Sequence, residues 1–594
     1  MHINAVTSLL LLNSVSVLAT TPLCQRTCQS ALSYIKFSGN GTKPQCTNEL
    51  NLISYFACLG RYCPSQMQDG YSTLQETCNG VSGLPELEKL TISPDTLDMF
   101  ALNDIRKKTS HAGVLSPSLY ALSERTITSA LEADELNVVY GNAIYGFWGI
   151  ILVIALIGRI HSLTNTRNSD TMLLSWMKRV MKATKQHLLI PKLFHNRNMR
   201  INDWCGFPTR LESLVVLGYI ALNVILHIVN HDVFEGNLKR PRISAQVARS
   251  LGHRTGTIVM ANLPIMWTFA MRNNVIAWFS GWNFSTFNVY HRWIARVIMA
   301  ELIAHAVSYT LVMYDSGGSK KYKAQWTEEY WIWGVVAVFV GLTMCISAIY
   351  PLRRRFYDAF LLVHILSAVV FLIGAWFHLK KSDKNFILYF WPCVAIWAFD
   401  RAMRYGRLIA LNRSLGQAVV MYDPDSDMMR LNVPIRSIVR PQAGTYYYIY
   451  IVGGLNFWES HPFTLASWTA NEEADGKVNL QFLIRPHAGF TARLKDLALK
   501  ECNSEDASGT PKGRRLLALV EGPYGHTSKI HSYGSALFIV GGSGVTVAMG
   551  HLQSLISKFE REGQVSIQKI RVVWAGYLKA TFFHVLEPQV LPQR

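Results

Sequence analysis

Long apolar runs constrain this chain more than any other feature of its sequence. Seven runs approach the roughly 17 to 25 residues that a helix needs to cross a bilayer, although the third and the last are marginal. They are residues 143–160, 211–229, 255–271, 290–312, 330–350, 356–379 and 386–402. Only 16% of the residues are charged, against about 25% in ordinary soluble domains. A single soluble enzyme and a disordered tail are therefore excluded, and the sequence predicts a multi-pass α-helical membrane protein with polar domains attached.

The N-terminal segment is typical of an exported chain. Residues 1–20 have a short apolar centre and end in small residues, which predicts a signal peptide removed near Ala19. An anchor helix is the alternative, but about ten apolar residues are too few to span a bilayer. Six of the ten cysteines follow at close spacing: Cys24, Cys28, Cys46, Cys58, Cys63 and Cys78. An even number in an exported segment predicts a disulfide-linked extracellular domain over residues 21–140, with the pairing left open. No CxxC pair supports zinc, and the glycosylation sequon at Asn40 agrees with an external location.

The basic residues indicate the orientation of the spans. Lys and Arg exceed Asp and Glu by 19, and many of them lie where an exported N-terminus and seven crossings place the cytosolic side. They are Lys178, Arg179, Lys182, Lys185, Lys192, Arg197, Arg200, Arg353, Arg354, Arg355, Arg401, Arg404 and Arg407. The outer loop with Lys239, Arg240 and Arg242 opposes this rule. The positive charge mainly marks orientation, and we expect no nucleic-acid partner.

Four histidines lie within two of the apolar runs. His291 and His305 are 14 residues apart, and so are His364 and His378. In a helix this spacing puts each pair on nearly one face, about 21 Å apart along the axis. The two helices run in the same direction, so His291 and His364 share an inner layer and His305 and His378 an outer layer. Two such layers suit two bis-histidine haems stacked in a helix bundle. Four core histidines bonded to backbone carbonyls are the alternative, which the identical spacing disfavours.

A second histidine pair lies elsewhere in the spans. His227 and His231, at i and i+4 in the second run, have the spacing of a metal-binding pair. The sequence shows no matching partner helix for them, which disfavours a metal site.

The pattern changes to strands after Arg407. Alternating and β-branched residues at 417–423, 428–435, 445–453 and 478–486 predict a small antiparallel barrel. Farther on, residues 536–540 predict a strand that leads into a glycine-rich loop and a helical run to about residue 559. Strand, glycine loop and helix in this order are typical of a nucleotide-binding turn, and another strand follows at 570–574.

The histidine spacing, together with the stretch His291-Arg292-Trp293-Ile294-Ala295-Arg296, resembles the ferric reductase transmembrane family. The resemblance implies two haem b groups in a transmembrane domain over residues 141–405. It implies that His291 and His364 ligate the inner haem iron, and that His305 and His378 ligate the outer. Arg292 and Arg296 would lie near the inner haem propionates, although ordinary inside-positive flanking explains them equally well.

The cytosolic part carries further motifs of this family. His461-Pro462-Phe463-Thr464 matches a motif that contacts the flavin of a ferredoxin-reductase-like barrel in ferric reductases and NADPH oxidases. The resemblance implies an FAD-binding domain over residues 406–525, with Gly489, Phe490 and Thr491 from a second motif against the FAD pyrophosphate. Glu521-Gly522-Pro523-Tyr524-Gly525 is also shared. The predicted NADPH-binding loop within residues 526–594 consists of Gly541, Gly542, Ser543, Gly544, Val545 and Thr546.

The sequence departs from the family near its end. Family members carry a Cys-Gly-Pro turn near the nicotinamide and a C-terminal aromatic over the flavin, and neither follows Trp574. The resemblance therefore predicts an incomplete α/β nucleotide-binding domain, from a truncated product or from one without dehydrogenase activity.

The resemblance implies a transmembrane electron-transfer enzyme of the plasma membrane. Electrons would pass from cytosolic NADPH through FAD and two haems to extracellular Fe(III) or Cu(II) chelates or siderophores, supplying a metal importer. A superoxide-producing NADPH oxidase is one alternative, although such enzymes usually lack a Cys-rich external domain. A non-catalytic haem membrane protein is the other.

Overall fold

The computed structural model describes residues 22–575 apart from short gaps. The gaps are residues 40–43, 79–83, 165–175, 177–178, 181, 195–199, 202–204, 207, 382–383, 414–416, 437–439, 453–458, 471–476, 500–512, 526, 529 and 564–565. The predicted signal peptide and the Asn40 sequon lie outside the described residues. The chain divides into two compact units. One is Met1–Met266 with Val289–Cys393, and the other is Trp267–Asn288 with Val394–Arg594.

Three disulfides link the first helices of the chain. They join Cys24 to Cys63, Cys28 to Cys58 and Cys46 to Cys78, which settles the pairing that the sequence left open. The elements of this part are α2 (Leu23–Leu32), β1 (Lys36–Phe37), α3 (Pro44–Thr47), α4 (Glu49–Tyr62), η1 (Pro64–Gln66), α5 (Met67–Thr77), α6 (Leu87–Leu90), η2 (Pro94–Thr96), β2 (Asp98–Phe100), η3 (Leu102–Asp104), β3 (Lys108–Thr109) and β4 (Gly113–Leu115). Five of the six cysteines lie within its buried core, so the covalent links restrict the unfolded chain and join buried helices.

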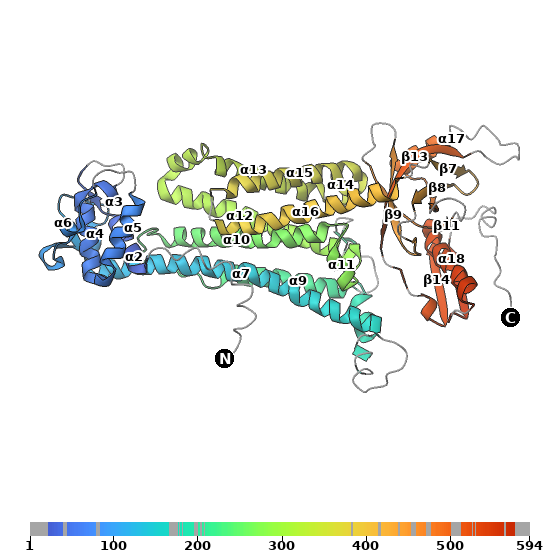
Figure 1. Cartoon of the computed structure of the whole chain (residues 1–594), viewed down its shortest axis with the longest axis horizontal. Helices are drawn as coiled ribbons and strands as arrows, with labels where there is room; N and C mark the ends of the chain where they lie inside the picture. Colours follow the sequence, from blue (N-terminus) through green and yellow to red (C-terminus); the bar gives the residue numbers. More distant parts are fainter. Residues whose placement is uncertain are drawn as a thin grey trace. The chain divides into compact units, whose positions relative to one another are not determined.

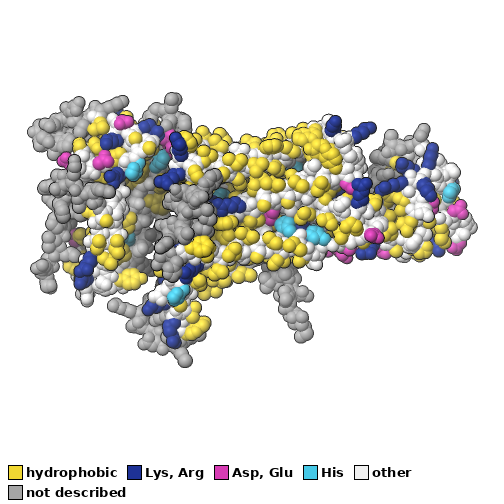
Figure 2. All heavy atoms as spheres, turned by 180° about the vertical axis from the view of Figure 1, so that it is seen from behind, with side chains coloured by type: hydrophobic (Ala, Val, Ile, Leu, Met, Phe, Trp, Pro, Cys, Tyr) yellow, Lys and Arg dark blue, Asp and Glu magenta, His cyan; other side chains and the backbone are white. Residues whose placement is uncertain are grey.

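Long helices make up the middle of the chain (Figure 1). They are α7 (Pro117–Thr164), α9 (Arg210–Ile228), α10 (Ile243–Ala270), α12 (Phe284–Gln325), α13 (Glu329–Ser347), α15 (Tyr357–Leu379) and α16 (Lys384–Leu411), with the shorter α11 (Val275–Ser280) and α14 (Tyr350–Arg355). Between α7 and α9 lie η4 (Lys185–Leu189), β5 (Arg200–Ile201) and β6 (Cys205–Gly206). Figure 2 shows that hydrophobic side chains cover much of the surface of these long helices. α7 and α16 run through the domain boundaries predicted at residues 140 and 405.

Five of these helices are long and apolar enough to cross a membrane: α7, α9, α12, α13 and α15. The third and seventh predicted spans are also helical, as α10 and α16, but they do not reach this level of hydropathy among the described residues. Both helices carry polar side chains, such as Arg254 on α10 and Asp400 on α16, and each contains an internal proline. The structure thus shows five candidate spans, and the prediction of seven stays a prediction.

A seven-stranded antiparallel sheet follows α16. Its strands, in spatial order, are β10 (His461–Thr464), β9 (Tyr446–Val452), β13 (Arg514–Tyr524), β7 (Ala418–Asp423), β8 (Met428–Arg436), β12 (Lys477–Ile484) and β11 (Ser467–Ala470). The four predicted strands correspond to β7, β8, β9 and β12. The described strands form an open order with β10 and β11 at its ends, so the predicted barrel is not closed by hydrogen bonds among them.

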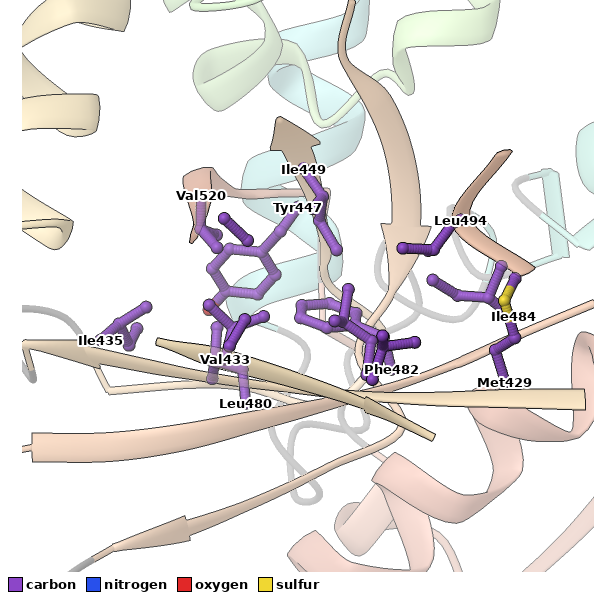
Figure 3. Close-up of a cluster of buried hydrophobic side chains, with 14 of the residues drawn as sticks. Met429, Val433, Ile435, Tyr447, Ile449, Leu480, Phe482, Ile484, Leu494 and Val520 are labelled. Carbon is purple, nitrogen blue, oxygen red and sulfur yellow. The ribbon is translucent and has the colours of Figure 1, made fainter. Parts of the chain in front are cut away.

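The core of this sheet follows from strict alternation along its strands. On β8, Met429, Leu431, Val433 and Ile435 are buried while the residues between them are more exposed, because successive side chains point to opposite faces. Figure 3 shows how Val433 and side chains of β9 and β12 point toward one another. Helix α17 (Phe490–Leu499) closes the core with Leu494.

The last described elements form a parallel β-α-β unit. Strand β14 (Ser535–Gly541) leads through the short turn η6 (Gly542–Gly544) into α18 (Val545–Glu562), and β15 (Lys569–Ala575) pairs in parallel with β14. A further turn, η5 (Ile530–Ser532), precedes β14. The order and type of these elements are those predicted from the sequence.

Non-reducing peptide mapping of the exported chain should recover the three cysteine pairs of the structure and no others. Replacing one partner, as in Cys46→Ser, should lower the free energy of unfolding of this domain by about 2–4 kcal/mol, because the unfolded chain gains freedom. Thermal unfolding with and without reductant measures this loss. A linked peptide with any other pairing would contradict the structure.

Candidate functional site

The four predicted histidines lie in two pairs on α12 and α15. The ring centroids of His291 and His364 are 6.4 Å apart, and those of His305 and His378 are 6.1 Å apart. Because residue numbers rise together on both helices, α12 and α15 run in the same direction. Each layer therefore receives one imidazole from each helix, and the layers are separated by about four helical turns.

Backbone carbonyls fix the orientation of three of the rings. The Nδ1 atom of His291 lies 3.1 Å from the Met266 carbonyl oxygen, that of His305 2.7 Å from Gly252, and that of His378 2.8 Å from Tyr330. A carbonyl only accepts hydrogen bonds, so Nδ1 carries the hydrogen and Nε2 presents its lone pair. This is the arrangement of a metal-ligating histidine whose other nitrogen is held by the protein.

Two glycines make room for the outer pair. A Cβ atom on Gly256 of α10 would lie 2.8 Å from the His305 ring, and one on Gly334 of α13 would lie 2.6 Å from Nδ1 of His378. No side chain larger than hydrogen fits at either position without moving the imidazole. Sequence reasoning missed both glycines. The available signal was their position inside apolar helices, where small residues permit close helix packing.

The geometry of both pairs fits an iron ion between two imidazoles. Bonds of about 2 Å to each Nε2 atom, as metals form with histidine, place the ring centroids roughly 6 Å apart. Both observed separations are close to this value. Near the inner pair, the Arg296 guanidinium lies over the Trp293 ring at 4.5 Å. The predicted role of Arg292 and Arg296 toward haem propionates stays a prediction.

The two predicted flavin motifs meet in space. Strand β10 consists of His461, Pro462, Phe463 and Thr464, and it pairs with β9 at one end of the sheet. The His461 ring lies 4.6 Å from the ring of Phe490, and Phe463 lies 6.1 Å from it. The structure therefore brings together two segments that are far apart in the sequence.

The start of α17 carries the rest of the second motif. Gly489 has a φ of +76°, which favours glycine, and a Cβ atom there would meet open space. The Thr491 hydroxyl oxygen accepts a hydrogen bond of 2.8 Å from the His487 amide. An open backbone at a helix start can receive an anionic group such as a pyrophosphate.

A buried carboxylate ties α16 to the sheet. Glu521 on β13 is only 2% exposed, and Arg404 donates to both of its oxygens, at 2.9 and 3.2 Å. The hydroxyls of Tyr450 and Tyr524 each donate to it at 2.6 Å, and Arg272 lies 3.5 Å away. Burial raises the pKa of Glu521, but the hydrogen bonds and charge of Arg404 and the tyrosine bonds outweigh it, so its pKa is below the usual range.

The glycine loop between β14 and α18 leaves its backbone accessible. Gly541 ends β14, Gly542 has a φ of +50°, and a Cβ atom on Gly542 or Gly544 would meet nothing within 4 Å. Ser543 precedes the first residues of α18, Val545 and Thr546, which are buried. The Trp574 indole donates to the Gly542 carbonyl at 3.0 Å and so fixes the turn against β15. An open, glycine-rich turn at a helix start is suited to phosphate.

Comparison with known families identifies both parts of the chain. Residues 255–375 match the ferric reductase like transmembrane component, and residues 412–528 match an FAD-binding domain. The first range contains three of the four paired histidines, and the second contains both flavin motifs. The chain is thus similar, in these two ranges, to ferric reductase transmembrane components and to FAD-binding domains.

Several fungal proteins are similar to this chain. A probable ferric reductase transmembrane component of Candida albicans is 27% identical, over 74% of this chain and 62% of its own length. Ferric/cupric reductase transmembrane component 2 of Saccharomyces cerevisiae is 25% identical, over 94% of this chain and 77% of its own length. A probable cell surface ferric reductase, kap2, of Aspergillus oryzae is 25% identical, over 62% of this chain and 48% of its own length. The chain thus spans between half and three quarters of these relatives.

The solved structures that match do so only weakly. A ferredoxin reductase in carbazole 1,9a-dioxygenase covers 27% of this chain and 42% of its own, at 15% identity and a TM-score of 0.18. This likeness is too slight to carry an argument.

Glu521→Gln should destabilise the part of the protein formed by α16 and the sheet, by about 3 kcal/mol, because it leaves Arg404 buried without its charge partner. Since the folded-state pKa of Glu521 is lowered, its contribution is complete above the unfolded carboxyl pKa of about 4.3 and is lost as the pH falls below it. Thermal unfolding between pH 3 and 7 should show a steeper acid loss in the wild type than in the variant. Glu560→Gln, on an exposed part of α18, is the control, and equal pH profiles for wild type and Glu521→Gln would contradict the assignment.

Proposed function

We propose that this protein carries electrons across a membrane from cytosolic NADPH to extracellular ferric or cupric chelates. The two stacked histidine pairs carry the proposal, because they lie about four helical turns apart and each would supply two imidazole ligands to one haem iron. FAD takes two electrons as a hydride and releases them singly, and haems carry single electrons across the bilayer. The protein's own part is to hold these groups at fixed positions, so no acid–base residue is required.

Each half of the path has its own residues. His291 and His364 would hold the inner haem, and His305 and His378 the outer. His461, Pro462, Phe463 and Thr464 on β10, with Gly489, Phe490 and Thr491 at the start of α17, would hold FAD. The loop Gly541–Thr546 would receive the phosphates of NADPH, because its glycines leave open space at the start of α18.

The topology of the proposal needs seven crossings. Helices α10 and α16 each contain 28 residues, which at about 1.5 Å per residue is long enough to span the hydrocarbon layer despite their polar side chains. The disulfide-linked domain then lies outside, consistent with an oxidising compartment, and the FAD-binding domain lies inside. A plasma membrane location is supported by the relative named as a cell surface ferric reductase.

The metal substrate is inferred from the relatives. Two of those described above are named ferric reductases and one a ferric/cupric reductase. Chelates or siderophores of Fe(III) or Cu(II) are thus the proposed acceptors, and the reduced ion would supply an importer.

Variants of the histidine layers test the haem assignment. His364→Ala should remove about half of the dithionite-reducible haem, because it takes one of two ligands from one of two layers. Gly334→Ala should have a similar effect on the other layer, since its Cβ would collide with His378. Gly146→Ala on α7, whose Cβ would meet open space, is the matched control. Unchanged haem content in His364→Ala, measured as the pyridine haemochrome, would refute the assignment.

An anaerobic absorbance spectrum of membranes containing the chain tests the whole path. NADPH should reduce most of the b-type haem, with dithionite added afterwards as the measure of total haem. Thr464→Val should keep the dithionite-reducible haem but lose bound flavin and the reduction by NADPH. If dithionite but not NADPH reduces the haem of the wild type, the haem layers are supported and the proposed entry of electrons from NADPH is refuted. If, in air, the rate of superoxide production exceeds the rate of ferric reduction, the protein is instead an oxidase.

A further inference from the structure

A buried carboxylate on α12 has no role in the proposed electron path. Glu301 is 6% exposed, and in the described part of the chain neither of its carboxylate oxygens has a hydrogen-bond donor. The nearest ionisable group recorded for it is His227 on α9, whose Nε2 atom lies 3.9 Å from Oε1 of Glu301. That distance is too long for a hydrogen bond. Ionisable groups inside a membrane domain are costly, and they usually mark a functional site.

Two side chains on α9, Asn223 and His227, each carry a buried acceptor atom without a hydrogen-bond donor among the described residues. The Nδ1 atom of His227 lies 2.6 Å from the Asn223 carbonyl, so it carries the hydrogen and leaves Nε2 with a lone pair. The Asn223 amide nitrogen donates to the Tyr219 carbonyl at 2.8 Å. Its oxygen is left as an acceptor, with no donor to it among the described residues. Asn223 and His227 lie one turn apart on the same face of α9.

Neighbouring polar groups do not relieve this arrangement. Arg254 on α10 is completely buried, but it donates to the carbonyls of Leu226 and Asn230 and to the side chain of Asn137. His231 has contacts at both nitrogens, at 2.7 Å to the Ser250 hydroxyl and at 2.8 Å to the His227 carbonyl. A protonated His227 would form only an ion pair without a hydrogen bond, which leaves two buried charges poorly satisfied.

We propose that Glu301 and His227, with Asn223 as a further oxygen donor, bind a divalent first-row transition-metal ion. A divalent cation satisfies a carboxylate oxygen, an imidazole lone pair and an amide oxygen together. Imidazole with oxygen ligands suits such ions. Two ligand atoms of a tetrahedral ion with bonds of about 2.1 Å lie roughly 3.4 Å apart, so a small closure of the 3.9 Å gap completes the contact.

The site has a consequence for electron transfer, which rests on the proposed function. Glu301 precedes the outer ligand His305 by one helical turn on α12. A positive ion at Glu301 lies within a low-dielectric region, where its field stabilises an added electron nearby. Electrons on the outer layer would therefore be favoured over those on the inner layer.

Metal analysis of the full-length protein in lipid nanodiscs tests the site. The protein is first dialysed against a chelator, and Zn²⁺ alone is then returned. The wild type should bind one zinc ion per chain. Glu301→Gln and His227→Asn should bind this ion with an affinity at least tenfold weaker than that of the wild type. His231→Asn is the matched control, because it removes an imidazole from the same helix end and should keep the zinc. Equal binding by wild type and both site variants would show adventitious zinc and overturn the proposal. Absence of stoichiometric zinc in the wild type would overturn it without any variant.

The haem spectrum of the same samples separates this proposal from the proposed function. A chain that shows no haem band but binds a zinc ion that Glu301→Gln loses supports the metal site and refutes the haem layers. A chain that contains haem but does not bind the zinc supports the haem layers and refutes the metal site. Where both are present, removing zinc should lower the midpoint potential of one of the two haems in a redox titration. This shift should be absent in Glu301→Gln, whose haem content also reports whether the variant has folded.

Discussion

The membrane part of this protein depends on the need to satisfy both nitrogens of each imidazole where water is scarce. In three of the four paired histidines, a backbone carbonyl of a neighbouring helix takes the Nδ1 hydrogen. Helix α10 supplies two of these carbonyls and α13 supplies one. The rotation of α12 and α15 about their axes is therefore fixed by the backbone of their neighbours, which a side-chain substitution does not remove.

Close packing is the condition for these hydrogen bonds. Helices α13 and α15 approach at Gly374, where a Cβ atom would lie 3.3 Å from the Trp333 carbonyl and 3.6 Å from the Ala337 side chain. The rings of Trp333 and Phe377 stack at 5.1 Å beside this contact. Small residues let the backbones meet, and aromatic rings fill the remaining space, as is usual for helices in lipid.

Sequence periodicity predicted the parts of this structure that repeat along one element. The 14-residue histidine spacing gave the two layers because helix geometry alone decides it, and alternation gave β7, β8, β9 and β12. Strands β10 and β11 contain only four residues each, and β13 carries Gly522 and Pro523, so their patterns were too short or too interrupted to detect. The open strand order of the sheet, the role of Glu521, and the roles of Gly256 and Gly334 depend on contacts between distant segments. No local pattern encodes them.

The two glycines beside the outer histidines also constrain how the gene for such a protein can vary. Every missense change of a glycine codon introduces at least a Cβ atom, and at Gly256 and Gly334 that atom falls within 3 Å of an imidazole ring. A change of one histidine removes one imidazole from its layer, whereas these glycines have no smaller or equal replacement. A change at either of these two codons would thus disturb the outer pair directly, although glycine has no side-chain atom to offer a metal.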